Sequence, residues 1–551
     1  MGQHSLKFGA LVNRYQQWPE LHTNEKGQVN FANVRSFLLA QPSNYVSSSL
    51  GAVVRRTYRF TTLGFYLQDD LRLRSNLTLN LGLRYEFYTM PQEVSGHGAA
   101  VRDLRNDAAA TVSPEVFGKN PSLRNLSPRF GFAWDVRGDG KTAVRGGFGL
   151  LYDIGNVGTG LMIASAGTPP FSGRSTVLNP VTFTIPLSFP PGSVGKSIRI
   201  IDYNLQQPHM LQYNLTVEQQ LPFGMGMTLA YGGSRGINRM TIPEGNPRTP
   251  QILPDGRKFW TGNEPRVNPN WETIELRTAG GNSWYNSLQF GLAKRLSQGL
   301  QFQSSYTWSK VIDETQGQSL ESKGNPTDPS DRRVDRGLAD FDVAHNWRFN
   351  AIYRLPELTS STGAFGKLLN GWWMSGILSL QSGYLLDPIL QAQRSRSGVG
   401  GVVAATGEDR PNLVAGRTRK DIISGVSTGC LGVPAGQKLG GPERYFDPCA
   451  FTIQPIGFLG NAGRNIIRGP GIATLDFSLV KDTALGFLGE SGKLEFRAEF
   501  FNVLNRVNFG FPSPSVYAAR ANVEPPLATA GRITNTVGTS RQIQLALKIL
   551  F

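Results

Sequence analysis

The chain of 551 residues has few of the features that mark several large protein classes: it contains two cysteines, five histidines and no long apolar run. A membrane-spanning helix needs roughly 20 predominantly apolar residues, and since no stretch approaches that length, helical membrane spans are excluded. No histidine lies near Cys430 or Cys449, which disfavours a zinc site there. Two cysteines in a segment rich in Gly and Pro instead indicate an oxidising compartment and one disulfide that closes a loop, with two free thiols as the alternative.

Positive charge is present but not clustered. Lys and Arg number 56 against 40 Asp and Glu, a net charge of +16, and no Lys/Arg-rich run occurs. Because nucleic-acid-binding domains gather their basic residues on one face or along one helix, we expect no nucleic-acid partner.

Apolar and polar residues alternate in many segments of the chain, most clearly in residues 541–551. One face of this segment carries Ile543, Leu545, Leu547, Ile549 and Phe551, and the other carries Gln542, Gln544, Ala546 and Lys548. Successive side chains of a strand point to opposite faces, so the segment predicts a strand with one apolar and one polar side. The terminal strand of a soluble sandwich would alternate in the same way and is the alternative.

Similar segments recur along the chain and predict about fourteen strands. They cover residues 5–14, 60–73, 77–88, 129–136, 142–152, 210–220, 225–234, 284–296, 299–309, 345–355, 371–383, 473–482, 492–503 and 541–551. Tight turns, such as the Asp-Gly turn at 137–141, alternate with long connections, such as 153–209 and 384–472. Short turns on one side and long loops on the other are typical of outer-membrane barrels, whereas sandwiches and propellers space their turns more evenly. The predicted fold is therefore an all-β, antiparallel transmembrane β-barrel with short periplasmic turns and long extracellular loops.

Five local motifs and the terminal Phe551 carry a resemblance to a known family. The motifs occupy residues 65–70 (FYLQDD), 81–86 (LGLRYE), 126–131 (LSPRFG), 340–346 (DFDVAHN) and 497–505 (RAEFFNVLN). The chain resembles the C-terminal barrel portion of a TonB-dependent outer-membrane receptor of the Oar-like kind, which also has a carboxypeptidase-regulatory-like domain. Receptors of this type have a signal peptide, a TonB-contacting segment, a plug domain and a barrel of about 22 strands.

The resemblance sets the expectations for residues 1–551 as one barrel domain. The first residues lack the cationic and apolar segments of a signal peptide, so we interpret the chain as a truncated barrel of the bacterial outer membrane. Its implied partners are outer-membrane lipid, the barrel assembly machinery, TonB through the missing plug, and an unknown solute. The face containing Ile543, Leu545, Leu547, Ile549 and Phe551 would be the outer-membrane assembly signal. A porin-like channel and a surface adhesion protein are the alternative functions.

No catalytic constellation is evident. Residues 192–197 end like a phosphate-binding loop, but Pro190 occupies the position of the first glycine and the preceding residues are Pro-rich. We therefore expect neither an enzyme nor a bound cofactor.

Two groups of loop residues are candidates for binding. Segment 328–342 is rich in aspartate, which suits calcium, but arginines interleave with the acids and mutual ion pairing is the favoured interpretation. Trp260 and Trp271 lie in a long loop and are candidate ligand contacts, with loop packing as the alternative.

Other side chains are expected to belong to the barrel wall. Trp372 and Trp373 suit an aromatic girdle at the periplasmic interface. The inner wall is expected to carry Arg72, Arg84, Glu86, Arg129, Arg145, Lys294, Arg348, Arg497 and Glu499.

Overall fold

A computed structural model describes residues 3–22, 24–31, 34–49, 51–155, 161–178, 184, 189, 196–315, 326–360, 363–399, 409–489 and 492–551. Its main feature is one sheet of 17 strands. Fourteen of them form an antiparallel meander in chain order: β1 (His4–Gln17), β4 (Tyr58–Arg74), β5 (Leu77–Tyr88), β9 (Leu126–Asp135), β10 (Thr142–Tyr152), β13 (His209–Leu221), β14 (Met225–Thr241), β17 (Ile274–Ser297), β18 (Leu300–Asp313), β20 (His345–Arg354), β21 (Trp372–Gln381), β27 (Ile472–Ala484), β28 (Lys493–Phe501) and β30 (Gln542–Leu550). Three short strands extend the sheet: β6 (Gln92–Glu93), β12 (Ile198–Ile201) and β19 (Gly337–Leu338).

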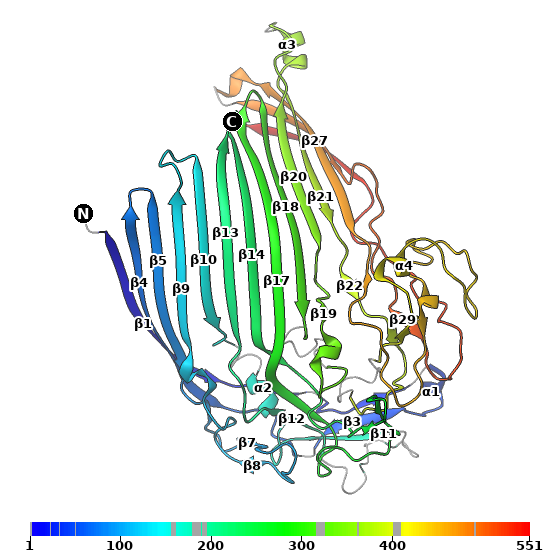
Figure 1. Cartoon of the computed structure of the whole chain (residues 1–551). Helices are drawn as coiled ribbons and strands as arrows, with labels where there is room; N and C mark the ends of the chain where they lie inside the picture. The colour runs from blue at the N-terminus through cyan, green and yellow to red at the C-terminus, as the bar shows by residue number, and fades with distance from the viewer. Residues whose placement is uncertain are drawn as a thin grey trace.

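The meander confirms the predicted antiparallel sheet. Strands β5 and β10 have the predicted bounds, because a tight turn fixes one end of each. The largest difference is β17, predicted at 284–296, which begins at Ile274 because its outer end continues into the loops. Short turns gather at one end of the sheet and long loops at the other (Figure 1).

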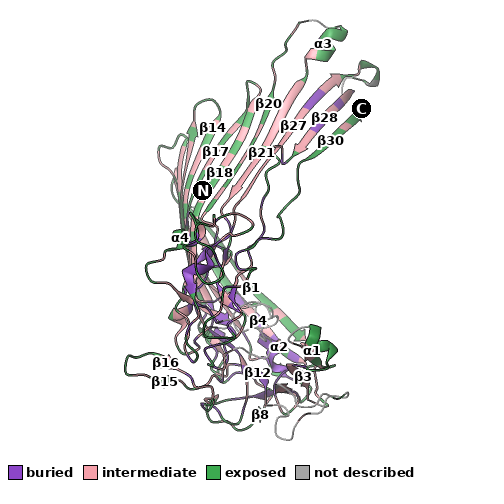
Figure 2. Ribbon diagram, turned by 90° about the vertical axis from the view of Figure 1, so that its right-hand side faces the viewer, coloured by how far each residue is buried: buried purple, intermediate pink, exposed green. Residues whose placement is uncertain are grey.

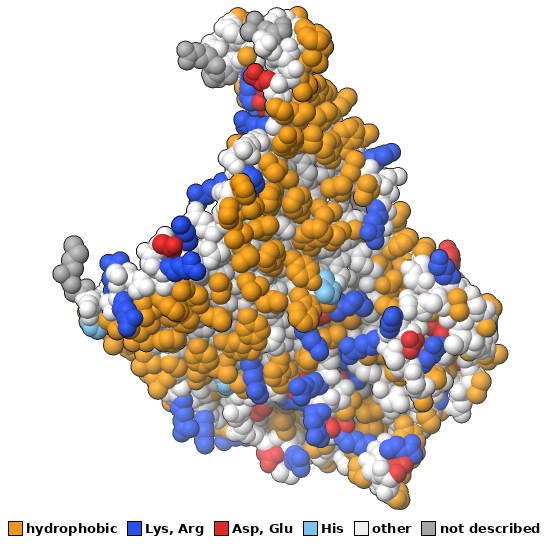
Figure 3. Space-filling view, turned by 45° about the horizontal axis from the view of Figure 1, so that its top comes forward, with side chains coloured by type: hydrophobic (Ala, Val, Ile, Leu, Met, Phe, Trp, Pro, Cys, Tyr) orange, Lys and Arg blue, Asp and Glu red, His pale blue; other side chains and the backbone are white. Residues whose placement is uncertain are grey.

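The sheet has one apolar and one polar face, as alternation requires. Register places Leu229, Phe290, Tyr306 and Trp347 side by side across β14, β17, β18 and β20, each between 37% and 42% exposed. One residue further along each strand, the opposite face carries Ala230, Gln289, Thr307 and Asn346. Figure 3 shows the apolar side chains as a broad band over the sheet. An exposed apolar surface of this extent marks a membrane-contacting face.

The sheet is curved, and its middle strands β14, β17 and β18 bulge toward the viewer of Figure 1 (Figures 1 and 2). The apolar band of Figure 3 covers this convex side, so the polar face is on the concave side. In the described chain β1 pairs in the sheet with β4 alone and β30 with β28 alone, and the two termini lie apart in both views. The first and last strands therefore each present an unpaired edge.

The long connections fold into a layer at the outer end of the sheet, which we call the loop layer. Its elements are β2 (Gln28–Asn30), α1 (Val34–Leu38), β3 (Asn44–Ser48), β7 (Ala99–Ala100), β8 (Thr111–Val112), η1 (Pro121–Arg124), α2 (Met162–Ser165), β11 (Arg174–Leu178), β15 (Gln251–Ile252), β16 (Lys258–Phe259), η3 (Arg332–Asp335), β22 (Leu385–Leu386), β23 (Ile389–Leu390), β24 (Asn412–Leu413), α4 (Arg419–Ile423), η4 (Pro448–Ala450), β25 (Phe451–Thr452), β26 (Ile467–Arg468) and β29 (Ser515–Tyr517). At the short-turn end lie α3 (Ala364–Leu369) and η5 (Gly486–Leu488). None of the described helices is long and apolar enough to cross a membrane.

Buried residues concentrate in this layer (Figure 2). One apolar core joins the strand ends at Tyr58 and Tyr88 to Met162 and Ile201. Another joins the two last long connections around Ile422, Phe446, Phe451 and Val516. The long connections thus pack against one another as a folded body and not as separate loops.

Candidate functional site

The polar face is lined by paired charges. Arg84 Nη2 lies 2.6 Å from Glu86 Oε1, and Lys7 Nζ lies 2.7 Å from Asp70 Oδ2 on the neighbouring strands. On β28, Arg497 Nε lies 3.3 Å from Glu495 Oε1. Such a face suits water or a polar solute and does not suit lipid.

Most residues predicted for the inner wall lie on this polar face. Two predictions are wrong: Lys294, predicted for the inner wall, lies on the apolar face, and Trp373, predicted for the girdle, lies on the polar face. Lys294 stands in register with Phe302, on the apolar side, and its Nζ folds back to the Leu300 carbonyl at 3.3 Å. Trp372 and Trp373 are the first two residues of β21, so their side chains point to opposite faces. Trp373 is on the polar face, beneath the Arg497 guanidinium at 5.8 Å, and only Trp372 can join an outer girdle.

A buried charge cluster holds part of the loop layer together. Glu275, at the outer end of β17, pairs with Arg199 of β12 at 2.7 Å, Arg277 at 3.0 Å and Arg174 of β11 at 3.7 Å. All three arginine side chains are at most 6% exposed. Burial, reinforced by the nearby Arg199 charge, lowers the pKa of Arg174. Glu275 is therefore an ion-pair partner shared by three buried arginines.

The two candidate loop tryptophans are both buried. Trp260 is 3% exposed, and its indole N–H donates to the Arg248 carbonyl at 3.0 Å. Trp271 is 8% exposed and donates to the Asp107 carbonyl at 2.9 Å. Both rings pack within the loop layer and present little surface to a ligand in this conformation.

The acidic segment 328–342 is occupied by ion pairs, mostly with distant residues. Asp335 pairs with Arg410 at 2.8 Å, Asp342 with Arg468 at 2.6 Å, and Asp331 with Arg333 at 2.9 Å. Asp328 contacts Lys258. No group of three or more potential metal ligands occurs among the described residues.

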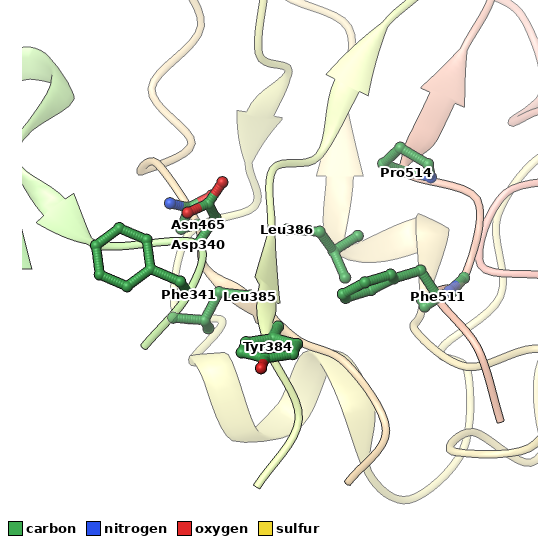
Figure 4. A pocket seen from close by; sticks show the side chains of 9 residues that line it. Asp340, Phe341, Tyr384, Leu385, Leu386, Asn465, Phe511 and Pro514 are labelled. Atoms are coloured by element: carbon green, nitrogen blue, oxygen red, sulfur yellow. The ribbon is translucent and has the colours of Figure 1, made fainter. Parts of the chain in front are cut away.

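An apolar pocket of about 430 Å³ opens at the outer ends of β20, β21 and β28 (Figure 4). Its lining includes Phe341, Tyr384, Leu386 and Phe511, and the rings of Tyr384 and Phe511 lie 6.4 Å apart. This volume is in the range of small-molecule pockets. The glycine-rich motif at 192–195 lies outside the described residues.

Comparison with known protein families identifies the family to which this sheet, with one apolar and one polar face, belongs. A family model for the outer membrane beta barrel domain matches residues 1–544. The chain belongs to this family. Its place is therefore the bacterial outer membrane, with the apolar face toward lipid.

Solved structures with similar folds are larger proteins. The outer membrane transporter YddB from Escherichia coli is 12% identical, with a TM-score of 0.48 over 99% of this chain and 52% of that one. The FrpB iron transporter from Neisseria meningitidis is 13% identical, with a TM-score of 0.41 and the same coverage. The siderophore receptor PiuA from Acinetobacter baumannii is 10% identical, with a TM-score of 0.40 over 89% of this chain and 43% of that one. The chain spans about half the length of these proteins. No curated protein sequence matches it.

Several site residues carried no sequence signal. Glu275 and Arg174 are about a hundred positions apart, and the pocket combines three separate connections. Glu244 is a further case: it follows β14 with no acidic or basic residue beside it, yet it is buried. Such sites arise from packing between loops, which periodicity does not encode.

Glu244 is expected to make the stability of the loop layer depend on pH. Burial raises its pKa to about 7, although its Oε1 accepts backbone hydrogen bonds from Asn246 and Ile274 at 2.9 and 2.8 Å. Since the folded state favours the protonated form, its stabilising contribution is complete below the ordinary pKa of 4.5 and is lost as pH rises through about 7. We expect proteolysis of segment 242–275 to be faster at pH 8 than at pH 5.5, and Glu244→Gln to remove most of that difference. An unchanged pH dependence in the variant would contradict this assignment.

The disulfide closes a loop beside the apolar core around Ile422, Phe446, Phe451 and Val516. Cys430 and Cys449 are bonded, 19 positions apart, and Cys449 is buried beside Ser427. Replacing both cysteines by serine is expected to cost this part of the loop layer about 3 kcal/mol, by the chain-entropy model. Proteolysis within 426–448 should accelerate, and reduction of the wild-type protein should reproduce the effect. Equal resistance of oxidised wild type and variant would show that the bond adds no stability.

Proposed function

We propose that the chain forms the wall and the outer loops of a TonB-dependent receptor of the Oar-like kind, which imports a solute bound on its outer side. The observation that carries this proposal is the polar concave face, lined by paired charges, with a folded loop layer at its outer end. A wall against lipid alone needs no such inner lining, whereas a route for a polar solute does.

The open sheet supports a further part of this proposal, that residues 1–551 are one portion of a larger barrel. In hydrocarbon every backbone N–H and C=O must be paired, so the free edges of β1 and β30 require partner strands. Strands from elsewhere in a longer polypeptide would complete the barrel, and a plug domain packed on the polar face would respond to TonB.

The mass of the native product tests this part. An antibody against the loop around Cys430–Cys449 should detect, in outer-membrane fractions, a band well above 60.3 kDa. A heat-modifiable band at that mass would instead mean a self-sufficient barrel and would advance the porin-like or adhesive alternatives.

Transport is tested in the native host by comparing solutes left in a defined medium by wild-type, gene-deleted and TonB-inactivated cells. We expect the same solutes to persist in both mutant cultures, and a copy of the gene with its full upstream region to restore uptake. Uptake that needs the gene but not TonB, together with conductance in planar bilayers, would favour a porin-like channel. Normal uptake with defective surface attachment would favour an adhesin.

The assembly signal gives a separate prediction. Phe551 is 92% exposed at the end of the face formed by Ile543, Leu545, Leu547 and Ile549, so deleting it removes almost no packing within the chain. We nevertheless expect the deletion to reduce the heat-modifiable form in outer membranes, because recognition by the assembly machinery would be lost. Phe8→Ala, at an 80% exposed site on the other edge strand, is the matched control. Equal effects of both changes would contradict a terminal signal.

A further inference from the structure

A polar row interrupts the apolar band at the outer side of β14, β17 and β18, and beyond it the same face carries Arg235, Trp284 and Ile312. The last row before this interruption is Tyr231, Leu288 and Trp308, and the next row on the same face is Gly233, Asn286 and Lys310. Exposed Tyr and Trp side chains at the end of an apolar band mark the membrane interface. The row of Gly233, Asn286 and Lys310 therefore lies at the level of the lipid headgroups.

Two further cations lie around a single indole, Arg235 in the next row of the sheet and Arg336 outside the sheet strands. Arg235 is in register with Trp284, and its guanidinium carbon lies 5.6 Å from the Trp284 ring. Arg336, which follows η3, places its guanidinium carbon 4.3 Å from the same ring. Cation–π contact holds both side chains in place while leaving their N–H groups available.

These cations have no acidic partner within the part of the chain that the structure describes. Among the described residues, Arg235, Arg336 and Lys310 take part in no ion pair, whereas the neighbouring Arg333, Asp335 and Asp313 do. All three side chains are exposed. Like charges gathered beside one ring repel one another, and an anion between them would relieve that repulsion.

Polar groups in the adjoining row can complete an anion site. Asn286 Oδ1 accepts hydrogen bonds from the hydroxyls of Tyr231 at 2.6 Å and Tyr213 at 3.3 Å. These bonds occupy the amide oxygen and orient the amide N–H₂ group as the free donor. The Asn286 amide stands directly opposite Lys310 in the ladder.

We propose that Arg235, Lys310 and Arg336 bind the phosphate groups of a lipid of the outer leaflet, whose acyl chains lie along the apolar band. Arginine forms paired hydrogen bonds with phosphate, and basic residues at a membrane surface attract anionic headgroups. Position decides the occupant, because the cations are on the lipid-facing side of the sheet and adjoin the band directly. A soluble anion would gain nothing from Trp308 and Leu288 beside it. This inference depends on the outer-membrane location and not on transport of a solute.

The test uses the native protein extracted from outer membranes into a zwitterionic detergent. Diphosphoryl lipid A, the same lipid with its phosphates removed, and inorganic phosphate are titrated, and bound lipid is counted by native mass spectrometry. We expect tight binding of the diphosphoryl form only, and no competition by inorganic phosphate. Arg235→Gln/Lys310→Gln/Arg336→Gln should bind about 100-fold more weakly, since each cation near an anionic lipid surface contributes a factor of about five.

The matched control removes three exposed cations from the short turns: Arg74→Gln/Arg137→Gln/Lys141→Gln. It should bind lipid as the wild type does. Arg336→Gln alone, outside the sheet strands, guards against misfolding of the triple variant and should weaken binding about fivefold. Equal binding of the dephosphorylated lipid, unchanged binding by the triple variant, or an equal loss in the control would overturn the proposal. Competition by inorganic phosphate would assign the site to a soluble anion instead.

Discussion

Leu229→Arg is expected to destabilise the membrane-inserted protein by about 2–4 kcal/mol, whereas Thr228→Arg, one residue away, is expected to be tolerated. Leu229 lies inside the apolar band, 42% exposed, between Met227 and Tyr231 on the same face of β14. An arginine there must bring its charge into hydrocarbon or distort the bilayer to reach water. Guanidinium titration of the protein in phospholipid vesicles measures the difference in free energy of unfolding.

The control position is informative because its new charge has a partner. Thr228 lies on the polar face in register with Glu218, which pairs with Arg145 at 3.3 Å. An arginine at this position can share that carboxylate and stay hydrated. Similar destabilisation by both substitutions would mean that both faces of the sheet contact an apolar environment. It would reject the assignment of the concave side as the face toward the solute.

Such face assignments could be predicted from the sequence wherever alternation is uninterrupted. Strands β5 and β10 agree with their predicted bounds because regular alternation runs up to a tight turn in each. Lys294 shows how the same rule corrects an error: Leu288, Phe290 and Leu292 alternate toward it, so it belongs with them on the apolar side. The prediction for Trp373 is wrong because it assigns both residues of an aromatic pair to the same girdle, although adjacent residues of a strand point to opposite faces.

The loop layer could not be predicted in this way. Its contacts join connections far apart in the sequence, as where the Trp260 backbone N–H donates to the Gly457 carbonyl at 2.9 Å. Neither periodicity nor local motif specifies such a pairing, because it depends on how the strands bring the connections together. The burial of Trp260 and Trp271, which decides between packing and ligand contact, follows from this assembly and not from their neighbours in the chain.

The strongest test of that assembly is Glu275→Ala, which is expected to cost the loop layer about 3–5 kcal/mol. The change leaves Arg174, Arg199 and Arg277 buried without the carboxylate that joins them. Removing one partner of a buried ion pair costs much more free energy than the pair contributed to stability, because the desolvation of the remaining charge is no longer offset. Hydrogen exchange of β12 and of the outer end of β17 should accelerate, while the membrane-spanning strands keep their protection.

Glu443→Ala provides the matched control, since Glu443 and Arg532 form a pair at 3.5 Å with side chains 77% and 52% exposed. An exposed ion pair contributes about 0–1 kcal/mol, so exchange in the loop layer should hardly change. Glu275→Gln separates charge from shape: it keeps the side-chain length but not the negative charge, and should resemble the alanine variant. If Glu275→Gln behaves as the wild type, the cluster is held by hydrogen bonding and the three arginine charges are compensated elsewhere. Exchange that accelerates equally in the membrane strands would instead show that the loop layer and the sheet unfold as one unit.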